Sequence, residues 1–258
     1  MRRDRGAVLL VAFGVAAGVD LASLAVGFDA GHLAAKPLLM PLLAAYAYTR
    51  GAPRPLLAAL LFGWGGDVLL LSDAEPAFLA GMGSFAVGHV CYLVQFGGLG
   101  RRDGLGRRDG PDGAGGLGRS GQPTYGAASS APSAAESGVA PAVASGVAYG
   151  LALVVAVVGL WPGLPADLRL PVACYSALLT TMAWAAARVG LVAGLGGALF
   201  VVSDMLIATG VAEWPQPPRP DLWIMLTYLA AQYLLTRGVL GAPAPSPLTS
   251  GSAAAEPS

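Results

Sequence analysis

Two acidic residues lie inside apolar stretches that are long enough to cross a lipid bilayer. Asp67 lies within Leu-Phe-Gly-Trp-Gly-Gly-Asp-Val-Leu-Leu-Leu, and Asp204 within Ala-Leu-Phe-Val-Val-Ser-Asp-Met-Leu-Ile. An Asp in hydrocarbon costs roughly 2.5–3.5 kcal/mol on insertion scales, so such residues persist mainly where they do chemistry or carry ions. The two carboxyls are therefore candidate acid/base or ion-binding groups. The alternative is that they form ion pairs with a lysine and hold helices together.

Further polar side chains fall in the same kind of stretch. His89 and Tyr92 are three residues apart, and Tyr228 and Gln232 are four apart, so each pair shares one helix face. Unpaired polar groups are costly in lipid, so we expect these groups to face one another in a pocket within a helix bundle. Single tyrosines also serve as structural hydrogen-bonding residues, and a lysine near a helix end can extend to the interface. The remaining members of this polar set are Lys36, which precedes Pro37, and Tyr175.

The composition defines the class of protein that must position these groups. The chain of 258 residues is 55% hydrophobic and 12% charged, whereas soluble domains carry about 25% charged residues. This indicates an integral membrane protein. The net charge is zero and no basic run is interleaved with aromatic residues, so no nucleic-acid partner is expected. Two Cys and two His are too few for a typical zinc site, and we expect no metal and no cofactor.

Apolar runs of suitable length predict an all-α, polytopic protein with eight transmembrane helices. Two groups of four helices, within residues 1–99 and 142–240, flank a Gly/Ser/Ala/Pro-rich segment at 100–141, which we interpret as a disordered cytoplasmic linker. Residues 241–258 are expected to form a disordered tail. The predicted spans are residues 7–28, 33–49, 55–72, 77–99, 142–160, 168–187, 189–210 and 221–240.

The distribution of arginines predicts the orientation of these helices. With eight spans, most arginines fall on one side and only Arg169 and Arg219 fall on the other. Cytoplasmic loops carry the excess of basic residues, so both termini are predicted to be cytoplasmic, in a bacterial plasma membrane. The helical rise of about 1.5 Å per residue then places Asp67 and Asp204 about 8–9 Å below the outer boundary.

Several segments together resemble the YhhN family of membrane proteins, which includes lysoplasmalogenases. They are Lys-Pro-Leu-Leu-Met-Pro-Leu at 36–42, Gly-Asp-Val-Leu-Leu-Leu at 66–71, Phe-Leu-Ala-Gly-Met-Gly-Ser-Phe-Ala-Val-Gly-His-Val-Cys-Tyr at 78–92, Gly-Gly-Ala-Leu-Phe-Val-Val-Ser-Asp at 196–204 and Thr-Tyr-Leu-Ala-Ala-Gln at 227–232. The resemblance implies an eight-helix hydrolase that cleaves the vinyl ether bond of lysoplasmalogens. The polar positions of the family pattern fall on Lys36, Asp67, His89, Tyr92, Ser203, Asp204 and Gln232.

The reaction implied by this resemblance needs an acid that protonates the vinyl ether and an anion facing the oxocarbenium ion that results, as in glycoside hydrolysis. We expect Asp67 and Asp204 to supply these two roles, in an order that the sequence leaves open. His89 is expected to orient water or an acid, and Lys36 to hold the phosphate. Substrate contacts are expected from Tyr92, Tyr175, Ser203, Tyr228 and Gln232.

Two other classes of function remain open at this stage. Membrane-embedded Asp, Lys and His also build ion pathways, so a small-molecule or proton-coupled transporter is one alternative. A lipid-binding membrane protein without catalysis is the other. The expected partners are a lysophospholipid and the surrounding membrane lipid. The sequence gives neither the headgroup preference nor the oligomeric state.

Overall fold

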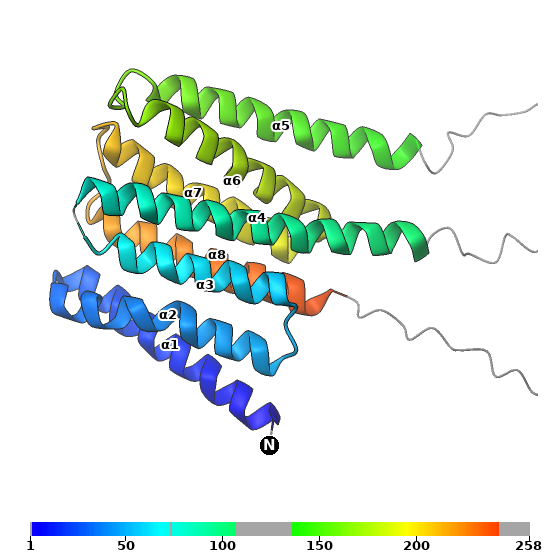
Figure 1. The fold of residues 1–258 in the computed structure, drawn as a ribbon, viewed down its shortest axis with the longest axis horizontal. Coiled ribbons are helices and arrows are strands. Elements are labelled where there is room, and N and C mark those ends of the chain that lie inside the picture. The colour runs from blue at the N-terminus through cyan, green and yellow to red at the C-terminus, as the bar shows by residue number, and fades with distance from the viewer. Residues whose placement is uncertain (1, 73, 107–135, 243–258) are drawn as a thin grey trace, which may run out of the picture.

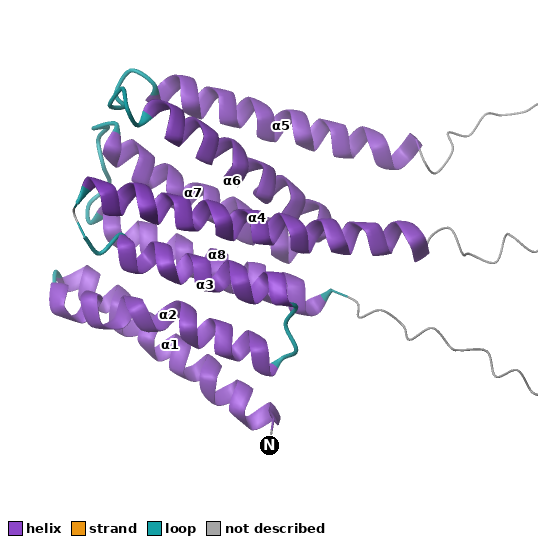
Figure 2. Cartoon of the chain, in the orientation of Figure 1, coloured by secondary structure: helices purple, strands orange, loops and turns teal. Residues whose placement is uncertain are grey.

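The computed structural model describes residues 2–72, 74–106 and 136–242, and within these ranges every regular element is a helix (Figures 1 and 2). The predicted all-α, polytopic fold is confirmed, and each predicted span coincides with one helix. The helices are α1 (Arg2–Val26), α2 (Asp29–Thr49), α3 (Arg54–Leu69), α4 (Glu75–Gly106), α5 (Glu136–Leu160), α6 (Arg169–Val189), α7 (Leu191–Val211) and α8 (Pro220–Gly241).

The helices run alternately up and down, so that the start of α1 and the end of α8 lie at the same end of the bundle (Figure 1). Arg50, Arg54, Arg188 and Arg237 lie at the helix ends on this side. The helix ends on the other side include Arg169 at the start of α6. The up-and-down order of the helices thus places the arginines mainly at one end of the bundle, as the sequence predicts. The cytoplasmic location of that end remains a prediction.

Hydropathy alone identifies only some of these helices as membrane spans. In the described ranges, α1, α4, α5, α6 and α7 contain segments long and apolar enough to cross a membrane. The others are shortened or made more polar by the residues they carry: α2 contains Lys36, and α8 contains Tyr228 and Gln232. Helix α3, with 16 residues, is about 24 Å long, short of the roughly 30 Å hydrocarbon core. The candidate polar side chains thus come from both groups of helices: Lys36, Asp67, Tyr228 and Gln232 lie on α2, α3 and α8, and His89, Tyr92, Tyr175, Ser203 and Asp204 lie on α4, α6 and α7.

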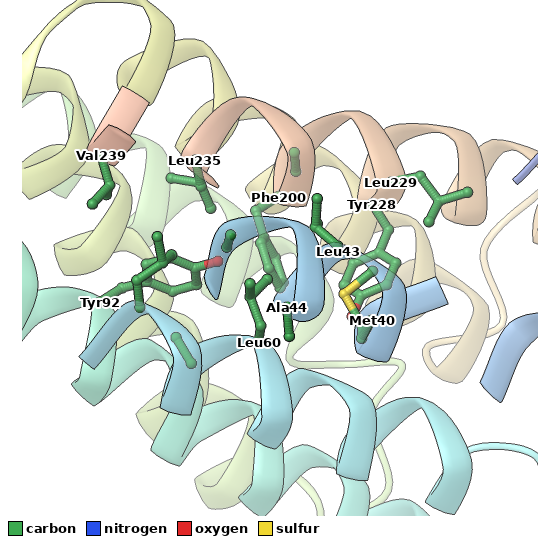
Figure 3. Close-up of a cluster of buried hydrophobic side chains, with 14 of the residues drawn as sticks. Met40, Leu43, Ala44, Leu60, Tyr92, Phe200, Tyr228, Leu229, Leu235 and Val239 are labelled. Atoms are coloured by element: carbon green, nitrogen blue, oxygen red, sulfur yellow. The ribbon is translucent and has the colours of Figure 1, made fainter. Parts of the chain in front are cut away.

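Close helix packing surrounds the buried core. A Cβ atom added at Gly196 would lie 2.8 Å from the backbone nitrogen of Leu235 on α8, and one at Gly197 would lie 2.8 Å from Cα of Ala183 on α6. These glycines allow α7 to pack closely between α6 and α8. Figure 3 shows the core beside them, where Phe200 lies among aliphatic and tyrosine side chains from α2, α3, α4 and α8.

The helices on either side of the predicted linker are longer than the predicted spans. Helix α4 continues to Gly106 and α5 begins at Glu136, so both extend into the segment assigned to a linker at 100–141. The rest of that segment, at 107–135, lies outside the described residues, as does the predicted tail from 243 onward.

Candidate active site

The first carboxyl, Asp67, ends a chain of buried hydrogen bonds that joins α3, α4 and α8. The Tyr92 hydroxyl donates to Oε1 of Gln232 at 2.6 Å, and Nε2 of Gln232 donates to the Tyr228 hydroxyl at 3.3 Å. The Tyr228 hydroxyl in turn donates to Oδ2 of Asp67 at 2.8 Å. All four side chains are buried. We call Asp67, Tyr228, Gln232 and Tyr92 the Asp67 network, and every proton in it is directed toward the carboxyl.

A glycine on α3 makes room for this network. A Cβ atom at Gly63 would lie 3.0 Å from Nε2 of Gln232 and 3.2 Å from the Tyr228 hydroxyl oxygen. One turn later, a Cβ atom at Gly66 would lie 2.5 Å from the ring of Phe85. The glycines beside Asp67 therefore accommodate side chains of the protein itself.

The second carboxyl, Asp204, ends a separate chain from α4 through α6 to α7. The Tyr175 hydroxyl donates a short hydrogen bond to Oδ2 of Asp204, and Nε2 of His89 lies 3.1 Å from the same hydroxyl. Because that hydroxyl has one proton and gives it to Asp204, this geometry assigns the donating N–H to Nε2 of His89. Nδ1 of His89 is buried and has no hydrogen-bond partner in the described residues. We call His89, Tyr175 and Asp204 the Asp204 network.

Two phenylalanines lie between the networks. The ring of Phe200 contacts His89 edge-to-face at 4.8 Å between centroids and Tyr228 at 5.5 Å. The ring of Phe85 lies 5.9 Å from Tyr228 and 6.4 Å from Phe200. These contacts form an apolar partition, so the predicted single polar pocket is divided into two parts.

A cavity of about 230 Å³ borders only one of the two carboxyls. Asp204 and Tyr175 line it, whereas Asp67 does not. Most of its other lining side chains are apolar and come from α4, α5, α6 and α7, with Ser176, Thr180 and Tyr149 as additional hydroxyl-bearing residues. The cavity therefore presents a carboxyl and a phenol within an apolar lining.

Of the six residues predicted to contact substrate, only Tyr175 lines this cavity; the five that do not are Lys36, Tyr92, Ser203, Tyr228 and Gln232. Lys36, on α2, is half-buried and interacts electrostatically with Asp67 and Asp20, but forms no salt bridge within the described part of the chain. Asp20 instead contacts His32, at 2.8 Å between Oδ1 and Nδ1. Ser203 is buried and donates to the backbone carbonyl of Ile224 at 3.1 Å, which ties α7 to α8.

The residue spacing on α6 contains a signal for the cavity. Val172, Tyr175, Ser176, Leu179 and Thr180 all line the cavity, and their spacing of three and four residues places them on one helix face. A stripe of hydroxyl-bearing and apolar residues of this kind can be read from the sequence once α6 is known to border a cavity. The sequence alone does not indicate which helix face does so.

In the described ranges, no group of three or more His, Cys, Asp or Glu side chains is arranged to hold a metal ion. Two carboxyls with phenol and imidazole partners are groups that can take part in acid/base chemistry.

Comparison with known proteins supplies the family context for this geometry. The model of the YhhN family matches residues 31–111 and 126–239, more than half of the chain. Curated relatives include "Lysoplasmalogenase TMEM86B" of Homo sapiens, which is 42% identical over 82 residues, and the protein of the same name from Rattus norvegicus, which is 40% identical over 80 residues.

These alignments cover limited parts of both proteins. They include 32% and 31% of this chain and 36% and 34% of the human and rat proteins, respectively. The chain thus matches about a third of the length of these relatives. No solved structure matches the chain.

Proposed function

Because this chain belongs to the YhhN family, we propose that it hydrolyses the vinyl ether bond of lysoplasmalogens, releasing a fatty aldehyde and a glycerophosphoethanolamine or glycerophosphocholine. Relatives similar over part of the chain are named lysoplasmalogenases, which supports this substrate class. We place the reaction in a membrane, with the bacterial plasma membrane as the expected location.

The observation that carries the proposal is the position of Asp204. Its carboxyl is held by the Tyr175 hydroxyl and borders an apolar cavity formed by four helices. A lysolipid needs an apolar site for its single chain and an acid beside its first carbons. In the described structure, the cavity at Asp204 combines these two features.

The chemistry proceeds in three steps that conserve protons. The acid donates a proton to the β-carbon of the vinyl ether, and the C=C electron pair forms the new C–H bond, which leaves an oxocarbenium ion. Water adds to the cationic carbon and loses a proton to the carboxylate, giving a hemiacetal. In the third step the hemiacetal hydroxyl loses its proton, its electron pair forms the C=O bond of the aldehyde, and the C–O bond to the glycerol breaks. The carboxyl returns the proton taken from water to the departing glycerol oxygen and takes up the hemiacetal proton, so it ends protonated as it began.

The two carboxyls take unequal roles in this scheme. Asp204, which faces the cavity, is the proton donor and then the base, and the Tyr175–His89 pair orients it. Asp67 lies behind the aromatic partition and interacts electrostatically with Asp204. As a buried acid near the site, Asp67 favours the positive charge of the oxocarbenium ion. Enclosure away from bulk water strengthens such interactions.

The test is aldehyde release by the purified full-length protein in lipid nanodiscs supplied with a lysoplasmalogen. The wild-type protein should release one aldehyde per lipid consumed, and Asp204→Asn should slow release by about 10²–10⁴-fold, the usual contribution of a general acid. Asp29→Asn, at the exposed start of α2, serves as a matched control with full activity. Full aldehyde release by a correctly folded Asp204→Asn protein excludes the acid/base assignment. Lipid or solute movement across liposomes without aldehyde favours a carrier instead.

A further inference from the structure

A cation occupies the outer end of the α6 face that lines the cavity. Arg169 begins α6, and Val172, one turn later, is the first α6 residue in the cavity wall. Tyr175 follows six residues after Arg169, which is about 9 Å deeper along the helix. Leu179 and Thr180 continue the same face still deeper. The face thus presents, in order, a positive charge, the phenol that binds Asp204, and a mixed stretch of Ser176, Leu179 and Thr180.

The guanidinium of Arg169 is held in place while part of it remains available. Its Nε donates to the backbone carbonyl of Leu164 at 3.2 Å, and the group stacks on the ring of Trp161 at 5.7 Å from the centroid. The side chain is half-buried, and across residues 2–72, 74–106 and 136–242 it forms no ion pair. An arginine held in this way can offer its Nη groups to a phosphate in the two-point geometry that a lysine cannot match.

The connection between α5 and α6 closes the outer end of the cavity next to Arg169. Leu164 and Leu168 are buried against Leu160 and Val172, both of which line the cavity. The hydrogen bond from Arg169 to Leu164 fixes this connection to the start of α6. The guanidinium therefore lies at the level of this cap, beside the outer end of the cavity.

Helices α4 and α5 both flank the cavity without packing closely on each other. Both helices contribute lining residues, yet α4 packs mainly on α3 and α6, while α5 packs mainly on α6. The outer surface of α5 carries exposed valines at 147, 154, 155 and 158, as a face in contact with lipid chains would. A hydrocarbon chain can therefore enter from the bilayer without crossing a polar barrier.

We propose that Arg169 and this cavity together form the binding site for a single-chain phospholipid, with the lipid phosphate on the Arg169 guanidinium and the hydrocarbon chain between α4, α5, α6 and α7. The first atoms of the chain then lie beside Asp204. This assignment deepens the proposed hydrolase function and uses the same site, but lipid binding itself does not require hydrolysis.

The other cations near this end of the bundle are poorly placed for the same lipid. Lys36 lies on α2, which contributes no residue to the cavity. Arg219, before α8, donates through Nη1 to the backbone carbonyl of Leu24 at 3.2 Å and so is engaged with α1. Arg169, in contrast, lies on the α6 face that lines the cavity. We therefore assign to Arg169 the phosphate contact that the sequence predicts for Lys36.

The test measures binding of two stable ligands to the full-length protein in nanodiscs. One is an alkyl-ether lysophosphocholine, which lacks the vinyl bond, and the other is the matching 1-O-alkylglycerol, which lacks the phosphate. Arg169→Gln should weaken binding of the phospholipid about tenfold or more and leave binding of the alkylglycerol within about twofold, because of the two ligands only the phospholipid has a phosphate for the guanidinium to contact. Arg169→Lys should retain part of the preference for the phospholipid over the alkylglycerol.

Arg188 gives a matched control on the same helix. Its guanidinium stacks on Trp184 at 5.1 Å, near the opposite end of α6 from the proposed site. Arg188→Gln should change neither affinity. A cavity-filling variant, Ala156→Trp, should weaken the binding of both ligands. It keeps the test decisive if Arg169→Gln fails to fold.

Three results would overturn the assignment: equal loss for both ligands in Arg169→Gln, unchanged binding of both in Ala156→Trp, or displacement of the phospholipid by millimolar inorganic phosphate alone. The last would indicate a site for free phosphate. Phosphate-dependent binding through Arg169 without aldehyde release from a lysoplasmalogen would contradict the hydrolase function and leave this lipid site standing.

Discussion

The Asp67 and Asp204 networks are built from the same parts but differ in what lies beyond them. In each, a tyrosine hydroxyl donates to the carboxyl and a second polar group supports the tyrosine. The Asp67 network is enclosed by protein, whereas Asp204 borders the cavity. The comparison teaches that two equally costly acids can differ in their access to a cavity. That access is the basis of the unequal roles proposed for them.

Replacing each acid in turn gives the largest expected contrast. Asp204→Asn should lower kcat for aldehyde release by about 10²–10⁴-fold, the usual contribution of a general acid. Asp67→Asn should lower it less, because Asp67 acts from behind the aromatic partition. Both rates are to be measured at saturating lysoplasmalogen on protein that elutes as a single species. A larger loss in Asp67→Asn would reverse the roles proposed for the two acids.

Removing the two tyrosine hydroxyls should separate activity from stability. Tyr228→Phe leaves a fully enclosed carboxyl without its donor, which costs about 1–3 kcal/mol of folding stability. Tyr175→Phe removes the donor to Asp204, but other groups in the cavity can still approach that carboxyl. This variant should therefore lose less stability than Tyr228→Phe and more kcat. Thermal unfolding and aldehyde release measured on both variants check this. If the two variants lose equal stability and equal kcat, the distinction between an enclosed and an accessible network is wrong.

Gly63 offers a finer test of how tightly the Asp67 network is enclosed. In Gly63→Ala, the new Cβ would lie 3.0–3.2 Å from atoms of Gln232 and Tyr228, so these side chains must move by a few tenths of an ångström. We expect a drop in stability of about 1–2 kcal/mol, in the range for tight small-to-large changes. Gly83→Ala is the control, since nothing lies within 4 Å of that position. If Gly63→Ala leaves the folding stability unchanged, the side chains of the Asp67 network have room to move.

The smallest effect is expected at Ser203, beside Asp204 in sequence. Its hydroxyl bonds to the Ile224 carbonyl, so Ser203→Ala should cost about 0.5–1.5 kcal/mol of stability. Because the group ties α7 to α8, KM for the lysolipid should stay unchanged. Steady-state kinetics over a range of lipid concentrations check this. A raised KM would restore the substrate contact first predicted for this residue.

The fold could be predicted from the sequence to a large extent, because helix length and apolar content are local properties. The starts and ends of α2 and α7 agree with the predicted spans within a few residues. Even α3 was predicted, although it is too short to register as a span by length. Turn residues such as Pro53 and Gly190 mark the helix boundaries where hydropathy alone is ambiguous.

The candidate site was harder to predict because it depends on which helix faces meet. Spacing correctly places His89 and Tyr92 on one side of α4, yet their partners lie on different helices, Tyr175 on α6 and Gln232 on α8. The aromatic partition that separates them depends on close packing such as that of Phe85 on Gly66, where a Cβ atom would lie 2.5 Å from the ring. Long-range packing of this kind leaves no periodic trace in the chain, so the sequence suggested one pocket where the structure has two networks.

Both networks are shared between the two groups of four helices. The hydrogen bond from Tyr228 to Asp67 joins α8 to α3, and the contact between His89 and Tyr175 joins α4 to α6. Neither α1–α4 nor α5–α8 contains a complete network. All of the contacts that assemble the site lie within residues 2–106 and 136–242. The site is therefore an interface between two halves, and neither half alone holds all of the side chains of either network.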